Sequence, residues 1–173
     1  MDPTERARTY AAFADATRRW VSVMDTKAGF LFAVNGALLT FMWIGARLGD
    51  VAPAAQWLAL GASLCSLLAL LAALWIVIPR PSTTSRRTPD RDHRAISFYG
   101  YVAERYADDD FPKFARDLEQ LDDADFSREA LAEHFIVSHI VTRKSRWVAI
   151  SGALTLTSMA LAGVALLVKT IQG

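Results

Sequence analysis

Three long blocks without Asp, Glu, Lys or Arg dominate the hydrophobic pattern of the chain. They are residues 28–46, a stretch within 51–79 that is most apolar at 57–78, and residues 147–168. Each block has at least 19 residues, and a helix rising about 1.5 Å per residue crosses a hydrocarbon core of about 30 Å in that length. The rest of a 173-residue chain is too short to bury three such helices as a soluble core. The pattern therefore predicts transmembrane helices over 28–47, 56–78 and 147–168.

Helical periodicity leads into the first and third blocks from the polar side. In residues 1–27 apolar positions recur three or four residues apart, and neither Gly nor Pro separates Met24 from the first span. A second such pattern begins near Asp125 or Ser127 and predicts one helix of about 40 residues through the third span. With Ser127 as its cap, Phe126 and Leu131 are placed to form a hydrophobic staple. The sequence has no strand-like alternation. It predicts an all-α integral membrane protein with three transmembrane helices and a small cytoplasmic helical region continuous with the spans.

The connecting segments differ sharply in length and composition. Residues 48–55, with Gly49 and Pro53, form a short loop, whereas 79–146 is a long polar region. Within that region the sequence predicts a linker at 82–89, a helix from Asp90 to about Tyr106, and a short helix from Phe111. The acidic runs 108–110 and 122–125 are predicted to be turns.

The distribution of Lys and Arg predicts the orientation. Residues 1–27 contain five and residues 80–146 contain twelve, against Arg47 alone in the short loop and Lys169 alone in the tail at 169–173. Because Lys and Arg are enriched on the cytoplasmic side, we expect the N-terminus and 79–146 to be cytoplasmic, and the short loop and C-terminus to face outward.

Charge and motif content exclude several classes of function. The net charge is +1, and the twelve Lys and Arg residues of 80–146 are balanced by thirteen Asp and Glu residues. This balance of charge disfavours nucleic-acid binding. The single cysteine, Cys65, lies in the second span. His134 and His139 are five residues apart and therefore on different helix faces, so no metal site is expected. The sequence has neither a glycine-rich phosphate loop nor a nucleophile–base motif, and we predict no enzymatic activity and no cofactor.

Polar and small residues inside the spans predict helix packing, because polar groups in lipid usually face other protein. The first span has Asn35 and a row of small residues, and the third span has a polar face. Packing among the three spans would account for these positions. Packing between copies of the chain is the other interpretation. The residues predicted to pack are Gly29, Ala33, Asn35, Ala37, Ser151 and Thr155.

The cytoplasmic mouths of the first and third spans lie at the same membrane depth. Asp25 and Lys27 precede the first span, and His139, Arg143 and Lys144 precede the third. These groups together could form a polar site beneath the membrane. Alternatively, Lys27 simply extends to the lipid headgroups.

Three aromatic residues, Phe98, Tyr99 and Tyr101, surround Gly100 in the long polar region. Phe98 and Tyr101 share a helix face on which a flat base could stack. Core packing of the cytoplasmic helices is the other interpretation, and Tyr99 fits it best.

The stretch from Trp20 through Asp25-Thr26-Lys27-Ala28 to Asn35-Gly36-Ala37-Leu38-Leu39 resembles the signature of the Pycsar transmembrane effectors. The later order is also similar: Ile96-Ser97-Phe98-Tyr99-Gly100 in the cytoplasmic segment, then Ser138-His139-Ile140 and Lys144 before the last span. Tyr99 stands where many relatives are expected to have Phe. The resemblance covers most of the chain, and its Asp-x-Lys-Ala motif is the most specific part.

The resemblance implies a function in bacterial antiphage defence at the inner membrane. A companion cyclase would make cyclic UMP (cUMP) or cyclic CMP (cCMP) on infection, and an oligomer of the effector would bind it and disrupt the membrane, causing abortive infection. A membrane-anchored helical adaptor that holds a protein partner, without ligand gating, is the alternative function.

Overall fold

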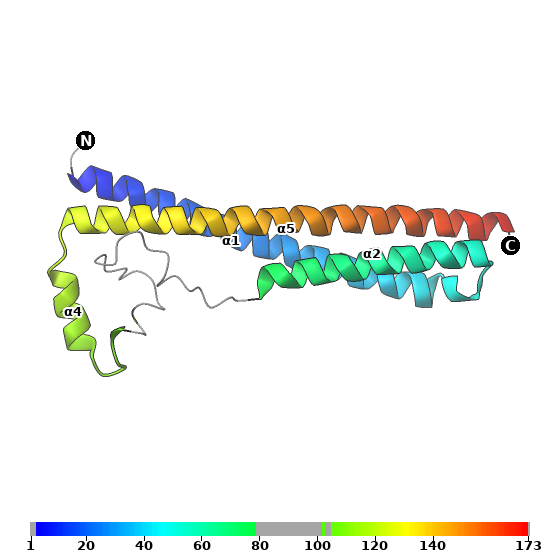
Figure 1. Cartoon of the computed structure of the whole chain (residues 1–173), viewed down its shortest axis with the longest axis horizontal. Coiled ribbons are helices and arrows are strands. Elements are labelled where there is room, and N and C mark those ends of the chain that lie inside the picture. The colour runs from blue at the N-terminus through cyan, green and yellow to red at the C-terminus, as the bar shows by residue number, and fades with distance from the viewer. Residues whose placement is uncertain (1–2, 79–101, 103–104, 173) are drawn as a thin grey trace. The chain divides into compact units, whose positions relative to one another are not determined.

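The computed structural model describes residues 3–78, 102 and 105–172 as helices joined by turns (Figure 1). The helices are α1 (Pro3–Thr40), α2 (Pro53–Val77), α4 (Phe111–Glu119) and α5 (Asp123–Gln172). Two short helical turns, Phe41–Gly45 and Leu48–Asp50, join α1 to α2. Three of these described helices are long and apolar enough to cross a membrane. The predicted all-α fold with spans continuous with other helical segments is confirmed, because α1 and α5 run unbroken from polar sequence into apolar sequence.

The chain divides into two compact units, and each is described here by itself. Unit 1 comprises residues 1–20 and 80–140, and unit 2 comprises residues 21–79 and 141–173. Unit 2 therefore contains the apolar parts of α1 and α5 together with all of α2.

A seven-residue spacing of small buried side chains organises unit 2. On α1 the fully buried residues Ala28 and Asn35 are seven apart, and Met42 continues this spacing in the helical turn that follows. On α5 Ser151, Ser158 and Ala165 repeat in the same way. A repeat of seven keeps one stripe of a helix facing its partner, as in a left-handed coiled coil. Small residues in these positions allow the backbones to approach closely, which is the usual basis of packing in lipid.

Hydrogen bonds add polar ties to this packing. The Ser151 and Ser158 hydroxyls on α5 donate to the backbone carbonyls of Ala69 and Ala62 on α2, at 2.9 and 2.7 Å. The Ser66 and Ser158 hydroxyls are also hydrogen-bonded, at 2.8 Å. Because the α5 residue number rises as the α2 number falls, the two helices are antiparallel. Ser151, one of the residues expected to pack, lies at this contact between α2 and α5.

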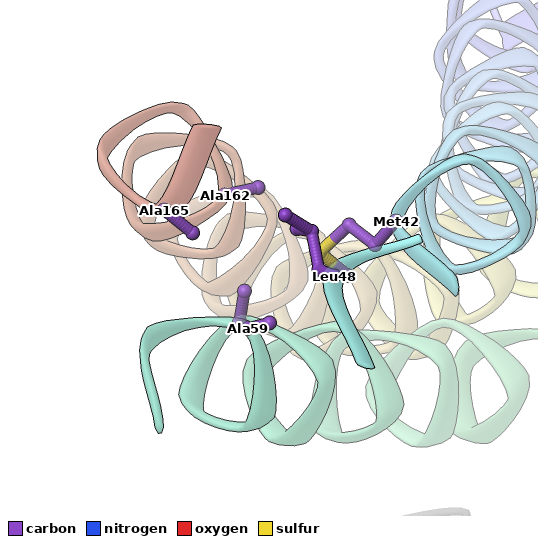
Figure 2. Close-up of a cluster of buried hydrophobic side chains, with 6 residues drawn as sticks. Met42, Leu48, Ala59, Ala162 and Ala165 are labelled. Atoms are coloured by element: carbon purple, nitrogen blue, oxygen red, sulfur yellow. The ribbon is translucent and has the colours of Figure 1, made fainter. Parts of the chain in front are cut away.

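The end of unit 2 that contains the α1–α2 turn has its own apolar cluster. Met42 and Leu48 are fully buried between α2 and α5, against Ala59, Ala162 and Ala165 (Figure 2). The chain reverses at Arg47, a non-glycine residue in the left-handed region with φ of 47°. Pro53 then occupies the first turn of α2, where its missing N–H costs nothing.

The beginning of α5 differs from the sequence prediction. The helix begins at Asp123 rather than at Asp125 or Ser127, and it has 50 residues rather than about 40. The N–H of Asp125 donates to the Asp122 carboxylate at 2.8 Å, and that of Asp122 donates weakly to Asp125 at 3.4 Å. This reciprocal pair caps the helix, so the predicted turn is its first turn. Ser127 therefore lies inside the helix, donating to the Asp123 carbonyl at 2.7 Å, and the staple prediction is wrong.

Unit 1 contains a small aromatic cluster at the base of α4. The predicted short helix is present, with Pro112 in its first turn. Tyr106 is buried and lies edge-on to Phe114 at 5.3 Å between ring centroids, and its hydroxyl donates to Asp117 at 2.8 Å. Burial, assisted by this hydrogen bond, raises the pKa of Tyr106 above its ordinary value.

Candidate functional site

An ion pair between Lys144 of α5 and Asp25 of α1 lies at the polar end of the spans in unit 2. The Lys144 ammonium donates to Asp25 Oδ1, and the side chains are 19% and 39% exposed respectively. Both helices reach this position from polar sequence, immediately before their uncharged blocks begin. The pairing joins two of the residues that the sequence predicted to meet. Its partial burial means that neither charge is fully hydrated.

Two further predicted residues flank this pair without joining it. Lys27 and Arg143 are exposed, and within the described segments neither makes an ion pair or side-chain hydrogen bond. Their charges are therefore not neutralised by another described side chain. In unit 1, His139 is exposed, with its ring edge-on to Phe135 at a centroid distance of 4.7 Å.

The predicted aromatic part of the site cannot be placed. Phe98, Tyr99 and Tyr101 lie outside the described residues, as does most of the helix predicted from Asp90. Their stacking role stays a prediction from the sequence.

Indole rings mark the same end of the spans as the ion pair. Trp75 of α2 and Trp147 of α5 make an edge contact at 6.3 Å between centroids. Trp147 follows Lys144 by less than one turn, and Trp75 lies near the end of α2. Because indole rings prefer the membrane–water boundary, we expect the Asp25–Lys144 pair to lie near the depth of the lipid headgroups.

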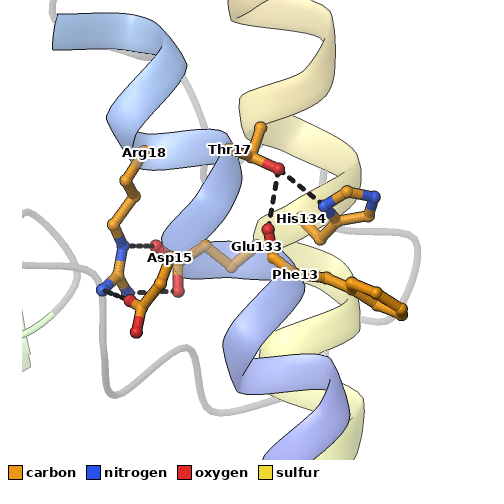
Figure 3. Close-up of polar contacts among 6 residues, drawn as sticks. All are labelled: Phe13, Asp15, Thr17, Arg18, Glu133 and His134. Atoms are coloured by element: carbon orange, nitrogen blue, oxygen red, sulfur yellow. Dashed lines mark hydrogen bonds and ion pairs between the residues drawn. The ribbon is translucent and has the colours of Figure 1, made fainter.

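A second polar contact, in unit 1, was not predicted from the sequence. The Arg18 guanidinium of α1 forms a bidentate ion pair with the Glu133 carboxylate of α5, and both N···O distances are 2.5 Å (Figure 3). Arg18 also pairs with Asp15 at 3.1 Å. The hydrogen bond that Arg18 donates to Glu133 raises the pKa of Arg18 above its already high ordinary value. Arg18 therefore stays charged at every pH of biological interest.

The neighbouring turn of α1 contacts His134. Thr17 Oγ1 donates to the Phe13 carbonyl and lies 2.8 Å from His134 Nδ1 (Figure 3). A hydroxyl has one proton, so when Thr17 donates to Phe13 it accepts a proton donated by Nδ1.

These contacts tie α1 to α5 and leave cationic groups available beside a partly buried pair. In the described part of the chain no three His, Cys, Asp or Glu side chains are grouped to hold a metal ion. An anion attracted to this end of the spans could replace the Asp25 carboxylate as the partner of Lys144.

The fold and this site define a class: a multi-pass membrane protein with helices that continue from its spans into polar sequence. The family model of the Pycsar effector protein domain matches residues 9–169. The chain therefore belongs to the Pycsar effector family and is a membrane effector of antiphage defence. No curated protein and no solved structure was found to match it.

Proposed function

We propose that this effector binds cUMP or cCMP on the cytoplasmic side and then disrupts the bacterial inner membrane, which stops growth of the infected cell. Membership of the Pycsar effector family supports the defence role. The observation that carries the ligand proposal is the partly buried Lys144–Asp25 pair. The exposed cations Lys27 and Arg143 are its near neighbours in sequence on the same two helices.

The pair supplies a physical means of gating. A cyclic mononucleotide carries one negative charge, which can replace Asp25 as the partner of Lys144. Ligand shifts a conformational equilibrium only if it binds one state better than the other. The state in which Lys144 is released from Asp25 offers the phosphate a free ammonium group, and the paired state does not. Binding therefore favours separation of α1 from α5 at this depth.

The Lys and Arg distribution supports the proposed orientation. With seventeen of the nineteen basic residues in 1–27 and 80–146, the N-terminus is cytoplasmic and the C-terminus faces outward. The ion pair then lies on the side of the membrane where a companion cyclase would release its product.

Leakage of a trapped dye from liposomes containing the purified protein tests this function directly. We expect micromolar cUMP or cCMP to start leakage, and cyclic AMP to leave the vesicles intact. Lys27→Ala and Lys144→Ala should require more nucleotide, whereas Arg8→Ala, which removes an exposed cation from the opposite end of α1, should respond like the wild type. Absence of both binding and leakage with either pyrimidine nucleotide would contradict the proposal.

One observation favours the adaptor alternative. Large apolar side chains are exposed in unit 1, outside the spans, among them Phe111, Phe126 and Phe135 at 72%, 42% and 58%. A protein partner that covers them would make the chain a membrane anchor. Leakage from liposomes of purified protein and lipid alone would exclude a partner as a requirement.

A further inference from the structure

The buried stripe of α5 in unit 2 is unusually polar for a lipid-embedded helix. Its central positions are Ser151, Thr155 and Ser158, which are 0%, 4% and 0% exposed. Ala162 and Ala165 continue the stripe and are also buried. Lysines lie at its two ends, Lys144 and Lys169. They are 25 positions apart on one helix, which places them about 38 Å apart, slightly more than the thickness of a hydrocarbon core.

An unmet hydrogen-bond acceptor lies in the same seam. Asn35 of α1 is completely buried, and its Nδ2 donates to Thr155 Oγ1 at 2.7 Å and to the Leu31 carbonyl at 2.8 Å. Thr155 uses its own proton on the Ser151 carbonyl. Asn35 Oδ1 is consequently left without a donor, and it is the one buried side-chain oxygen or nitrogen without a partner in the segments that the structure describes. A buried acceptor in this condition gains a hydrogen bond when water reaches it.

Other helices cover the stripe by contacts that can be exchanged for water. On the α1 side these are the Lys144–Asp25 pair, the Asn35–Thr155 hydrogen bond, and a hydrogen bond of 2.6 Å from Lys169 to the Ala46 carbonyl. Towards α2 the serine hydroxyls donate to main-chain carbonyls. At the Ala162 and Ala165 end the cover is apolar, formed by Met42, Leu48 and Ala59 (Figure 2).

We infer that this stripe of α5, from Lys144 to Lys169, is the path along which water and small ions cross the membrane when the effector is active. The inference rests on the proposed function and specifies how the membrane is disrupted. One chain has too few spanning helices to enclose a path, so several copies turn their stripes towards a common axis. Once uncovered, Ser and Thr hydroxyls can still donate to the carbonyl one turn earlier, as Thr155 already does. Opening therefore leaves few of the stripe's polar groups without a partner.

The release of Lys144 links the ligand to this path. The ion pair with Asp25 is the contact of the α1 cover that lies at the cytoplasmic mouth. When a nucleotide phosphate takes Lys144, the cover is weakened at that mouth first, and water next meets the unmet oxygen of Asn35.

Cysteine accessibility in the full-length protein tests the path. The background carries Cys65→Ala, which removes the single native thiol. Ser158→Cys and Ala162→Cys place a thiol on the stripe. The matched control Leu156→Cys places one on the same helix outside the stripe, at a side chain that is 69% exposed. The Ala162 side chain makes no hydrogen bond. The Ala162→Cys thiol therefore measures accessibility of the stripe even if Ser158→Cys disturbs packing. Each protein in liposomes is treated with a membrane-impermeant, negatively charged thiol reagent, with and without cUMP or cCMP, while dye leakage is recorded.

A thiol reacts as the thiolate, which forms in water and not in lipid. We expect nucleotide to raise the modification rate at residues 158 and 162 by at least about tenfold, and at residue 156 by less than about twofold. Leakage with unreactive stripe thiols would overturn the path and leave the proposed function standing. Equal reactivity at all three positions would indicate general breakdown of the bilayer and would also overturn the path. Absence of leakage with either nucleotide would remove the proposed function, and the path with it.

Discussion

Asn35 on α1 and Thr155 on α5 are joined by a hydrogen bond of 2.7 Å between side chains that are both buried in the spanning unit. The Asn35 amide is only partly satisfied, because its oxygen has no donor while both protons of its nitrogen are used. The contact therefore holds α1 to α5 and keeps an unfavourable group buried at the same time.

Thr155→Val should destabilise the protein by removing the acceptor for Asn35 Nδ2. The expected loss is about 0.5–2 kcal/mol, since hydrogen bonds between membrane helices contribute modestly and a newly unmet donor adds a penalty. Thermal unfolding in detergent micelles measures it. The double variant Asn35→Leu/Thr155→Val should recover most of the loss, because no polar atom is then left unmet. A double variant less stable than Thr155→Val would contradict this account.

Asp25→Asn should increase affinity for the cyclic nucleotide. The substitution removes the charge that competes with phosphate for Lys144 and retains a group that can accept a hydrogen bond. We expect dissociation constants, measured by calorimetry, to fall by about tenfold, the equivalent of about 1.4 kcal/mol. Lys144→Ala should act in the opposite direction. Asp15→Asn, an exposed carboxylate elsewhere on α1, is the control. Weaker binding by Asp25→Asn would show that Asp25 itself holds the ligand.

Much of the arrangement could be predicted from the sequence because the bilayer imposes strong constraints. Spans need uncharged blocks of fixed length, and both Asp25 and Lys144 immediately precede such blocks, so their equal depth followed from position alone. The pairing of Arg18 with Glu133 could not be predicted in this way. Its geometry depends on the rotation of two helices that are more than a hundred residues apart, which packing decides. The start of α5 was missed because Asp residues are favoured both in turns and at helix caps.

Glu133→Gln should lower the folding stability of unit 1, because it removes the negative charge that pairs with the Arg18 guanidinium. The two side chains are 50% and 22% exposed, so solvent screens the pair and the expected loss is about 0.5–1 kcal/mol. Chemical denaturation at low and high salt measures it, and the difference from wild type should shrink as salt rises. Lys113→Gln, which removes a more exposed pair between α4 and Asp110, the residue just before it, should change stability by less. Equal effects of the two substitutions would contradict a special role for the bidentate pair.

Tyr106 should ionise at higher pH than an ordinary tyrosine. Its pKa is raised in the folded protein, so the folded state binds the phenolic proton more tightly than the unfolded state does. The stability that this provides is complete below the ordinary pKa of 10.0 and is lost as the pH rises through the higher folded value. The ultraviolet absorbance of tyrosinate, compared between wild type and Tyr106→Phe, isolates its titration. Asp117→Asn should lower the midpoint, and an unchanged or higher midpoint would contradict the assigned hydrogen bond.

Ala33→Leu should prevent assembly of copies while leaving the single chain folded. Gly29, Ala33 and Ala37 are exposed on α1, and a side-chain carbon placed on Gly29 would meet nothing within 4 Å. Leucine at this row therefore disturbs no contact within the chain but would hold a neighbouring helix away. Cross-linking in liposomes reports the assembly. Ala28→Leu, at a completely buried position five residues earlier, should instead destabilise the chain itself. Undiminished cross-linking of Ala33→Leu would place the contact between copies elsewhere.

The lysine charges at the ends of the α5 stripe would decide which ions cross the membrane along it. In the open path Lys144 is paired with the nucleotide phosphate, so the free ammonium group is that of Lys169 at the other entrance, and a ring of fixed positive charge there repels cations and concentrates anions. In a bilayer that separates unequal concentrations of potassium chloride, the zero-current voltage would then move towards the equilibrium value for chloride. An infected cell would lose its resting potential through an inward or outward flow of small anions while retaining most of its potassium.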